Sequence, residues 1–277
     1  MSGLTPRGCE IHTERMALGL RSAIGSDVGR RRTANEDSGA AGDRLLVVAD
    51  GMGGHAHGEL ASTLTVAAML ELDERLPQDL TQVDLLGELA SAVDEASERL
   101  AEHARKEPDT QGMGTTVVAL VFDGARLALA HVGDSRIYLC RGGELRQLTR
   151  DHTMVQQLVD EGQITPEEAL VHPRRSVLMR ALSTEHPVEA DLEFLEPQPG
   201  DRYLLCSDGV TAVLPDKAIE DLMAAPTGPE VVVEQLITLA NQGGGPDNIT
   251  CIVADVVDAG EAQAQGVRVV GAASELA

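Results

Sequence analysis

One stretch of the sequence restricts the fold more than any other: an apolar run, 45–49, that ends on Asp50 and continues through Gly51, Gly53 and Gly54. An unbroken apolar run of this length predicts a strand that is buried on both faces. The glycines permit turns and close backbone approaches that a side chain would block. Asp50 alone has two readings, a turn former at the strand end or a metal ligand. The choice depends on whether other carboxylates reach the same place.

The composition of the 277 residues narrows the possible partners. Hydrophobic residues make up 43% but aromatic residues only 1%, so we expect an aliphatic core and no stacking on exposed bases. The net charge is -23, which disfavours binding to nucleic acid or to an anionic membrane surface. Most of the carboxylates are expected to serve solubility, and a minority could bind cations.

The four cysteines, Cys9, Cys140, Cys206 and Cys251, form no CxxC pair. Three of them lie in apolar runs, so we expect buried free thiols in a reducing compartment, and neither disulfides nor a zinc site. No apolar run approaches the roughly 18 residues of a membrane helix, and no signal pattern opens the chain. The expectation is a soluble, cytoplasmic monomer.

The pattern along the chain predicts one domain, 18–258, between an N-terminal extension, 1–17, and a flexible tail, 259–277. Strands are expected at 18–25, 44–50, 117–122, 126–132, 137–140, 144–148, 203–207 and 249–257. Helices are expected at about 58–76, 80–106, 154–161, 215–225 and 229–241, with a further helix start at Thr165. The order of these elements predicts an α+β domain of two sheets with helices outside them, and 150–182 form an irregular lobe on its surface.

Four aspartates share one local design. Asp50, Asp134, Asp208 and Asp247 each lie at the end of an apolar strand, beside a glycine or in a glycine-rich turn. If those strands are neighbours, the carboxylates converge, and they repel one another unless they share protons or cations. Carboxylate oxygens favour Mg²⁺ or Mn²⁺. The four motifs together favour a divalent-metal site.

Such a site suits phosphate hydrolysis, because two cations can share a water and lower its pKa toward neutrality. The basic triplet Arg30, Arg31 and Arg32 could then hold phosphate oxygens, although a solvated turn is the alternative. No nucleotide-binding P-loop is present in the sequence. Metal-assisted phosphate hydrolysis is the simplest interpretation.

Six motifs, in order, give the chain a family resemblance. They are Arg32-x-x-x-Glu36-Asp37, Asp50-Gly51-Met52-Gly53-Gly54-His55, Gly112-Met113-Gly114-Thr115-Thr116, Gly133-Asp134-Ser135-Arg136, Ser207-Asp208-Gly209 and Gly245-Pro246-Asp247-Asn248. From about 20 to 257 the sequence resembles the bacterial metal-dependent Ser/Thr protein phosphatases of type 2C. The resemblance implies a four-layer α-β-β-α sandwich of two antiparallel sheets, with helix pairs outside and a flap at about 150–182.

The resemblance also implies metal ligands, for two Mn²⁺ or Mg²⁺ ions per subunit with room for a third. Asp50 would bridge two ions, and the Gly51 carbonyl would bind one of them. Asp208 and Asp247 would bind the second ion. Asp134 would hold the third together with Asp208.

Other roles follow from the same resemblance. Glu36 and Asp37 would act through metal-bound waters. Arg32 has the family's phosphate-binding spacing, so Arg30 and Arg31 are expected to be solvated. Arg32, Asp50 and Asp208 would be the catalytic residues.

One departure from the family pattern concerns the general acid. Animal members carry a histidine directly after the Asp-Gly pair, where this chain has Met52. His55 could substitute, but a position at a helix N-terminus or in solvent is equally compatible, so the general acid stays open. His152 and His172 are expected at the flap surface rather than in catalysis.

The resulting hypothesis is hydrolysis of phosphoserine and phosphothreonine in proteins by a hydroxide that bridges two metal ions, reversing a bacterial Ser/Thr kinase. The expected partners are phosphorylated proteins, including such a kinase and its substrates. The acidic surface favours basic partner segments. The alternatives are a non-catalytic phosphoprotein-binding module on the same fold, and a phosphatase of an anti-sigma partner-switching system.

Overall fold

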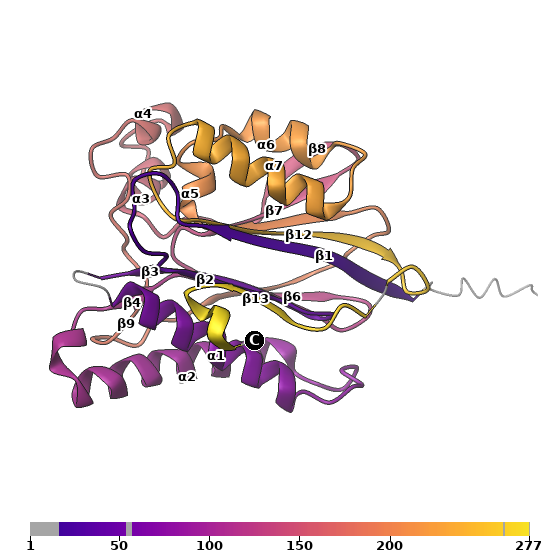
Figure 1. The fold of residues 1–277 in the computed structure, drawn as a ribbon, viewed down its shortest axis with the longest axis horizontal. Coiled ribbons are helices and arrows are strands. Elements are labelled where there is room, and N and C mark those ends of the chain that lie inside the picture. Colours follow the sequence, from indigo (N-terminus) through magenta and orange to yellow (C-terminus); the bar gives the residue numbers. More distant parts are fainter. Residues whose placement is uncertain (1–16, 54–56, 263, 277) are drawn as a thin grey trace, which may run out of the picture.

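Two antiparallel sheets lie face to face between two layers of helices (Figure 1). The structure is a computed structural model that describes residues 17–53, 57–262 and 264–276. The first sheet has the order β1 (Leu18–Asp27), β12 (Ile249–Asp258), β11 (Arg202–Cys206), β7 (Arg136–Arg141) and β8 (Glu144–Gln147). The expected four-layer α+β sandwich is therefore confirmed.

The second sheet contains the central apolar strand. Its order is β10 (Asp191–Leu195), β6 (Leu127–Val132), β5 (Val117–Phe122), β3 (Leu45–Met52), β2 (Asp37–Ala41) and β13 (Arg268–Gly271). Two short strands extend it at one end, where β4 (Gly114–Thr115) pairs with both β3 and β9 (Leu182–Ser183).

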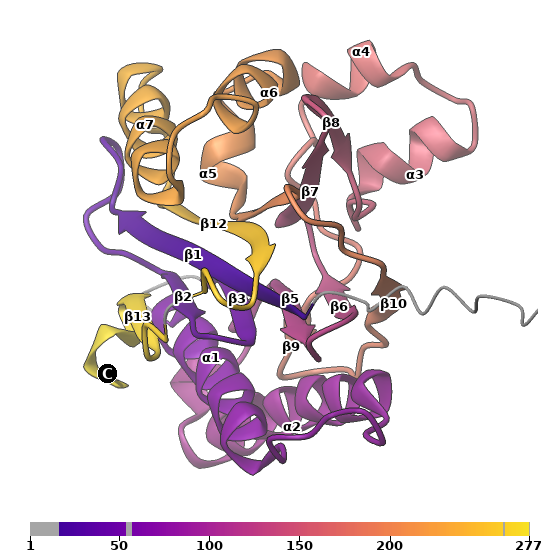
Figure 2. The ribbon, with the colours of Figure 1, turned by 90° about the vertical axis from the view of Figure 1, so that its right-hand side faces the viewer.

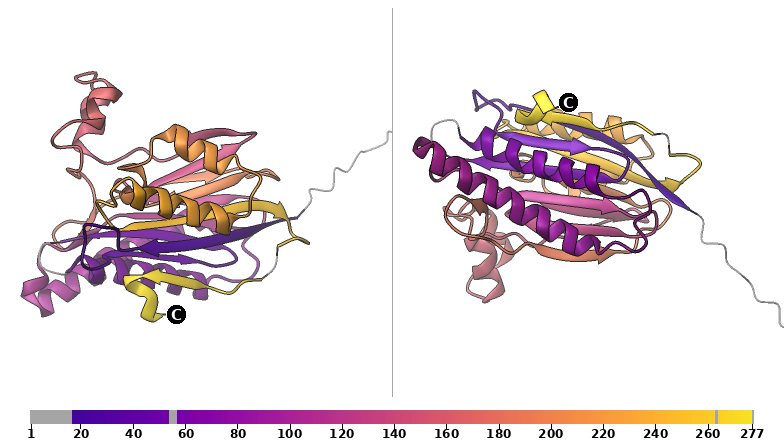
Figure 3. Two further views of the ribbon diagram at one scale, coloured as in Figure 1. Left: turned by 45° about the horizontal axis from the view of Figure 1, so that its top comes forward. Right: turned by 90° about the horizontal axis from the view of Figure 1, so that it is seen from below.

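Helices cover the outer face of each sheet. The second sheet is covered by α1 (Gly58–Arg75) and α2 (Leu85–Lys106), which run side by side in Figure 3. The first sheet is covered by α5 (Asp208–Thr211), α6 (Asp216–Met223) and α7 (Pro229–Gln242). The flap carries α3 (Met154–Asp160) and α4 (Pro166–Leu170), and it projects beside α6 in Figure 2. Two 3₁₀ turns, η1 (Pro108–Thr110) and η2 (Ala272–Leu276), complete the described elements.

Strand β3 is apolar throughout because both of its faces are buried. Leu45, Val47 and Ala49 pack toward α1 and α2, whereas Leu46 and Val48 pack into the core between the sheets. This alternation is the two-residue period of a strand, and the helix layer on one side removes the usual polar face. The result is a rigid strand that ends at Asp50.

The second half of the chain builds a third core on the same principle. Leu204 and Cys206 of β11 and Val253 of β12 pack against α6 and α7, where Val232 and Leu236 are fully buried. The three described cysteines, Cys140, Cys206 and Cys251, are buried free thiols, as predicted, and Cys9 lies outside the described residues.

The end of the chain differs from the expected flexible tail. Residues Arg268–Gly271 form β13, which pairs with β2, and Ala273 is fully buried within the core beneath α1. The strand is only four residues long and has one apolar pair, Val269 and Val270, so its own pattern predicts no strand, and its pairing partner β2 is supplied by the fold. Of the expected N-terminal extension, 1–16 lie outside the described residues.

Candidate metal centre

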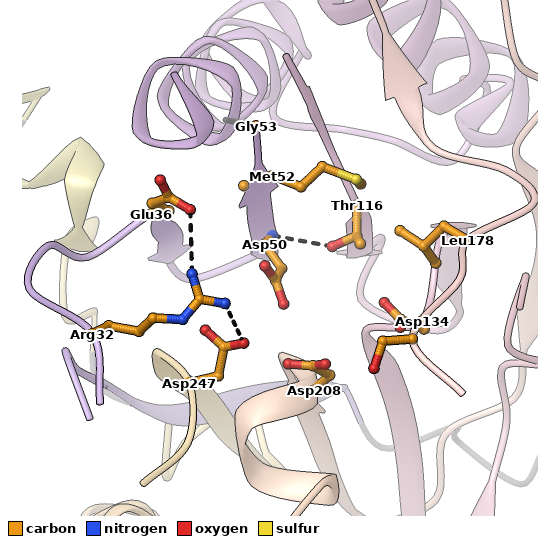
Figure 4. Close-up of a pocket in the computed structure, with 12 residues that line it drawn as sticks. Arg32, Glu36, Asp50, Met52, Gly53, Thr116, Asp134, Leu178, Asp208 and Asp247 are labelled. Atoms are coloured by element: carbon orange, nitrogen blue, oxygen red, sulfur yellow. Dashed lines mark hydrogen bonds and ion pairs between the residues drawn. The ribbon is translucent and has the colours of Figure 1, made fainter. Parts of the chain in front are cut away.

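Four carboxylates meet at one end of the sandwich, as the sequence predicts. Asp50 ends the buried part of β3, and Asp134 lies in the turn between β6 and β7. Asp208 opens α5 directly after β11, and Asp247 precedes β12. All four line one cavity of about 310 Å³, into which their side chains point in Figure 4.

The strand register brings a fifth carboxylate against this group. Asp37 is paired directly with Asp50 across β2 and β3. It is buried behind the cavity, and its carboxylate accepts a hydrogen bond from Ser207 Oγ at 2.7 Å. Glu36, one residue earlier, lines the cavity itself, and its backbone N–H donates to Asn248 Oδ1 at 2.8 Å. Glu36 therefore borders the cavity, whereas Asp37 lies in the core behind it.

The backbone at Asp50 is held on both sides. Its N–H donates to Thr116 Oγ1 at 3.0 Å, and its carbonyl accepts from Thr115 Oγ1 at 2.9 Å. Gly51 is needed for close packing, because a Cβ there would lie 2.0 Å from the Gly58 carbonyl oxygen. These contacts fix the direction in which the Asp50 side chain leaves the strand.

Burial and mutual repulsion raise the pKa of four carboxyl groups at the site, those of Asp37, Asp50, Asp134 and Asp208. Burial, with repulsion from Asp208, raises the pKa of Asp37 to about 7 and that of Asp134 to about 7. Burial and repulsion from Asp247 raise the pKa of Asp208 to about 6. The pKa of Asp50 lies well above its ordinary value, because Asp50 is buried and Asp37 and Asp208 repel its charge. The protein alone supplies too little positive charge to balance these carboxylates.

Divalent cations fit this deficit. Asp208 Oδ1 is buried and has no hydrogen-bond partner among the described residues, so one of its lone pairs is free for a ligand. The donors that face the cavity are carboxylate oxygens, which are the ligands that Mg²⁺ and Mn²⁺ prefer. The donor set and its electrostatics both suit a hard cation.

Arg32 is placed at the rim of the same cavity. Its Nη2 donates to Asp247 Oδ2 at 2.7 Å, and its Nη1 lies 3.8 Å from Glu36 Oε2 (Figure 4). Its side chain remains 45% exposed, so part of the guanidinium fork can still reach an anion. Arg30 and Arg31 are exposed and do not line the cavity, in agreement with the prediction for them.

Some residues of the cavity gave no signal in the sequence. Ser176 and Leu178 reach it from the flap, where no motif marks them. Thr116 belongs to a recognised motif, but its contact with Asp50 depends on the pairing of strands. Met52 lines the cavity, and His55 lies outside the described residues.

The expectation for one flap histidine was wrong. His152 was expected at the flap surface, yet its side chain is 4% exposed and contacts the turn that carries Asp134. Sequence periodicity could not reveal this, because the contact joins residues on two separate segments.

Comparisons with known proteins agree with this geometry. A family described as protein phosphatase 2C matches residues 24–241. The serine/threonine protein phosphatase PstP of Mycobacterium tuberculosis is 52% identical over 253 residues, which cover 91% of this chain and 48% of PstP. The chain thus spans about half the length of PstP. Serine/threonine phosphatase stp of Listeria monocytogenes is 37% identical over 85% of this chain and 96% of its own length.

Solved structures show the same likeness. The catalytic domain of PstP, crystallised with two manganese ions, matches with a TM-score of 0.80 and 51% identity, covering 87% of this chain and 100% of that domain. Stp1 from Staphylococcus aureus matches with a TM-score of 0.78 and 32% identity, over 91% of this chain and 99% of that one.

Proposed function

Because this chain belongs to the protein phosphatase 2C family, we propose that it hydrolyses phosphoserine and phosphothreonine in proteins with the help of Mn²⁺ or Mg²⁺. The observation that carries the proposal is the convergence of Asp50, Asp134, Asp208 and Asp247 on one cavity with Arg32 at its rim. A carboxylate cluster of this kind holds hard cations, and an arginine beside it recognises phosphate.

Individual ligands can be assigned within the proposed site. Asp50 lies between the other groups and would bridge two cations, one of which would also take the Gly51 carbonyl. Asp208 and Asp247 would hold the second cation, and Asp134 would hold a third, sharing it with Asp208. Each of these residues lines the cavity, which supports the assignment.

Glu36 and Asp37 would act less directly. Glu36 borders the cavity and can reach a bound cation through a water. Asp37 is buried, accepts from Ser207 and faces Asp50 across the strand pair, so it would set the charge and position of Asp50. Both are outer members of the proposed centre.

The chemistry divides between the cations and the protein. Bound divalent cations would lower the pKa of a water in the cavity and offset the charge of the phosphate. Arg32 would bind the phosphate oxygens through its fork, and Thr115 and Thr116 keep Asp50 in place while charge develops. The Met52 thioether has no proton to give, so protonation of the leaving serine or threonine must come from another group.

The partners of this activity are phosphorylated proteins, and we propose that they include a Ser/Thr kinase and the substrates of that kinase. Three buried free cysteines suit the reducing cytoplasm. No helix of the described residues is long and apolar enough to cross a membrane. We propose a monomer as the working unit, because one chain supplies Arg32 and every carboxylate of the proposed centre.

The proposal is tested with a phosphothreonine peptide and purified protein. Phosphate release should require Mn²⁺, stop in excess EDTA, and fall at least about 100-fold in Asp208→Asn, because the variant removes one negative charge from the cation ligands. Asp221→Asn, an exposed carboxylate on α6, is the matched control and should keep full activity. Full activity in EDTA would contradict the proposal. Peptide binding without turnover would favour a non-catalytic phosphoprotein-binding module instead.

A further inference from the structure

The conformation of the turn that carries Asp134 is determined by the residues on either side of it, Gly133, Ser135 and Arg136. Gly133 comes directly before Asp134 with a φ of 111°, which favours glycine. Ser135 Oγ is hydrogen-bonded to Thr116 Oγ1 at 2.7 Å, the same hydroxyl that accepts from the Asp50 N–H. Arg136 is paired with Asp151, with Nη2 to Oδ2 at 2.7 Å. The Asp134 carboxylate itself is free to face the cavity.

His152, which follows Asp151, holds the remaining side of this turn. Its Nδ1 accepts from the Gly133 N–H at 3.0 Å, and its own backbone N–H donates to the Gly133 carbonyl at 2.8 Å. His152 thus contacts both backbone groups of Gly133, and His131 Nε2 lies 3.0 Å from the same carbonyl oxygen. The side chain is only 4% exposed, so water cannot replace the contact to Nδ1.

The other ring nitrogen of His152 anchors the residue to β10. His152 Nε2 lies 3.0 Å from Asp191 Oδ2, and Arg180 Nη1 donates to the other oxygen of Asp191 at 2.8 Å. The His152 ring also packs on the ring of His131, with centroids 4.4 Å apart. These contacts fix the ring plane and therefore the direction of Nδ1.

This cluster is not itself a cation site, although the ligand atoms of His131, His152 and Asp191 lie within 4.8 Å of one another. Because His152 Nδ1 accepts a hydrogen bond, the neutral ring carries its proton on Nε2. That nitrogen faces Asp191 and also contacts Arg180 Nη2, so a carboxylate and a guanidinium already occupy the place that a metal would need. The hydrogen bonding assigns the cluster a positioning role.

We propose that His152 is a positioning residue that holds the Gly133–Asp134 turn so that the Asp134 carboxylate can bind a cation. The inference rests on the proposed metal site and adds to it a residue that touches neither cation nor substrate. Groups that orient metal ligands typically change metal affinity by about 10- to 100-fold when they are removed. The loss should be confined to the cation position that needs Asp134.

The test separates the two ring nitrogens by isosteric variants. Asn at 152 places an oxygen near the position of Nδ1 and keeps an acceptor for the Gly133 N–H, whereas Gln reaches only the position of Nε2. Mn²⁺ is titrated by calorimetry into wild type, His152→Asn, His152→Gln and His152→Leu, with thermal unfolding measured for each. Asp134→Ala is the reference for loss of the ligand itself. His186→Ala, an exposed histidine beyond the flap, is the matched control.

We expect the Mn²⁺ site that Asp134→Ala weakens to lose about 10-fold or more in affinity in His152→Leu and His152→Gln and to stay within about 3-fold of wild type in His152→Asn. The other Mn²⁺ sites should be unchanged in all three variants. In the double variant with Asp134→Ala, His152→Leu should add no further loss. Wild-type affinity in His152→Leu, or an equal loss at every site that Asn does not restore, would overturn the inference. If wild type bound no Mn²⁺, the proposed function itself would fail, and this inference with it.

Discussion

Arg32 is the one basic residue among the described residues that line the acidic cavity. It is held by Asp247 and Glu36, two of the carboxylates that we assign to the metal centre. Cation binding would compete for these carboxylates and release the guanidinium toward an incoming phosphate. Arg32 therefore connects cation binding and phosphate binding.

Substitution of Arg32 tests this link. Arg32→Ala should lower kcat/KM for a phosphopeptide by about 10- to 100-fold, the equivalent of one charge-assisted contact of about 1.5–3 kcal/mol. Mn²⁺ affinity should not fall, because the variant frees Asp247 and Glu36. Arg32→Lys keeps the charge but not the fork and should be intermediate. Steady-state kinetics with Arg31→Ala as the control decide the matter, and an equal loss in Arg31→Ala would refute the role of Arg32.

The residues of the centre differ in whether the sequence alone predicts them. Asp50, Asp134, Asp208 and Asp247 could be found because each combines an apolar strand with a terminal carboxylate and a glycine. The contacts of Thr116, Ser176 and His152 could not, since they arise where separate segments meet. A single sequence records the ends of strands but not which segments become neighbours.

Among the elements, strands with two buried faces were the predictable ones. The apolar runs of β3, β5 and β12 predict strands directly, whereas β2 (Asp37–Ala41) contains mainly small and polar residues, and its sequence predicts no strand. All five residues of β2 are buried, because β3 and β13 flank it. These residues form a strand because β3 and β13 pair with them rather than because of their own β-propensity.

Strand β13 and the 3₁₀ turn η2 that follows it support β2 through a small number of specific contacts. The Ala273 N–H donates to Ser38 Oγ at 3.1 Å, and Ser38 Oγ is bonded to Ser62 Oγ of α1 at 2.8 Å. Gly271 adopts a φ of 76°, and a Cβ there would lie 2.1 Å from the Asp37 carbonyl oxygen. The end of the described chain is thus fitted against the strand that carries Asp37.

Gly271→Ala should therefore loosen this segment and lower stability by roughly 1–3 kcal/mol, because the variant combines an unfavourable φ with a steric clash. Thermal unfolding should show a fall of several degrees, and hydrogen exchange should rise in 268–276. Gly260→Ala is the control, since a Cβ there meets nothing within 4 Å. Equal melting temperatures for the two variants would show that β13 does not contribute to stability.

Across the whole molecule, acidic residues lie both on the surface and at the proposed metal centre, where their mutual repulsion destabilises the fold. The net charge of -23 is spread over the chain, but the carboxylates with raised pKa values gather in one partly buried cluster around the cavity. Repulsion within that cluster opposes folding when no cation is bound. Cations should therefore stabilise the fold as well as enable the reaction.

The pH dependence of stability tests this balance at Asp134. Its folded pKa is raised from 3.8 to about 7, mainly by burial, so its carboxyl group favours folding most when protonated. That contribution is fully present below the unfolded pKa and is lost as the pH rises through about 7. In EDTA, Asp134→Asn should therefore be more stable relative to wild type at pH 8 than at pH 5, by roughly 1–3 kcal/mol.

Thermal unfolding of the two proteins in EDTA at pH 5, 6.5 and 8 measures the effect, with Asp221→Asn to correct for loss of an exposed carboxylate. The difference in melting temperature should grow by at least about 2 °C across this range. Saturating Mn²⁺ should reverse its sign at pH 8, because wild type then gains binding free energy through Asp134 that the variant lacks. A difference in melting temperature that is constant with pH would mean that burial does not raise the pKa of Asp134. A sign that Mn²⁺ leaves unchanged would mean that Asp134 does not bind the cation.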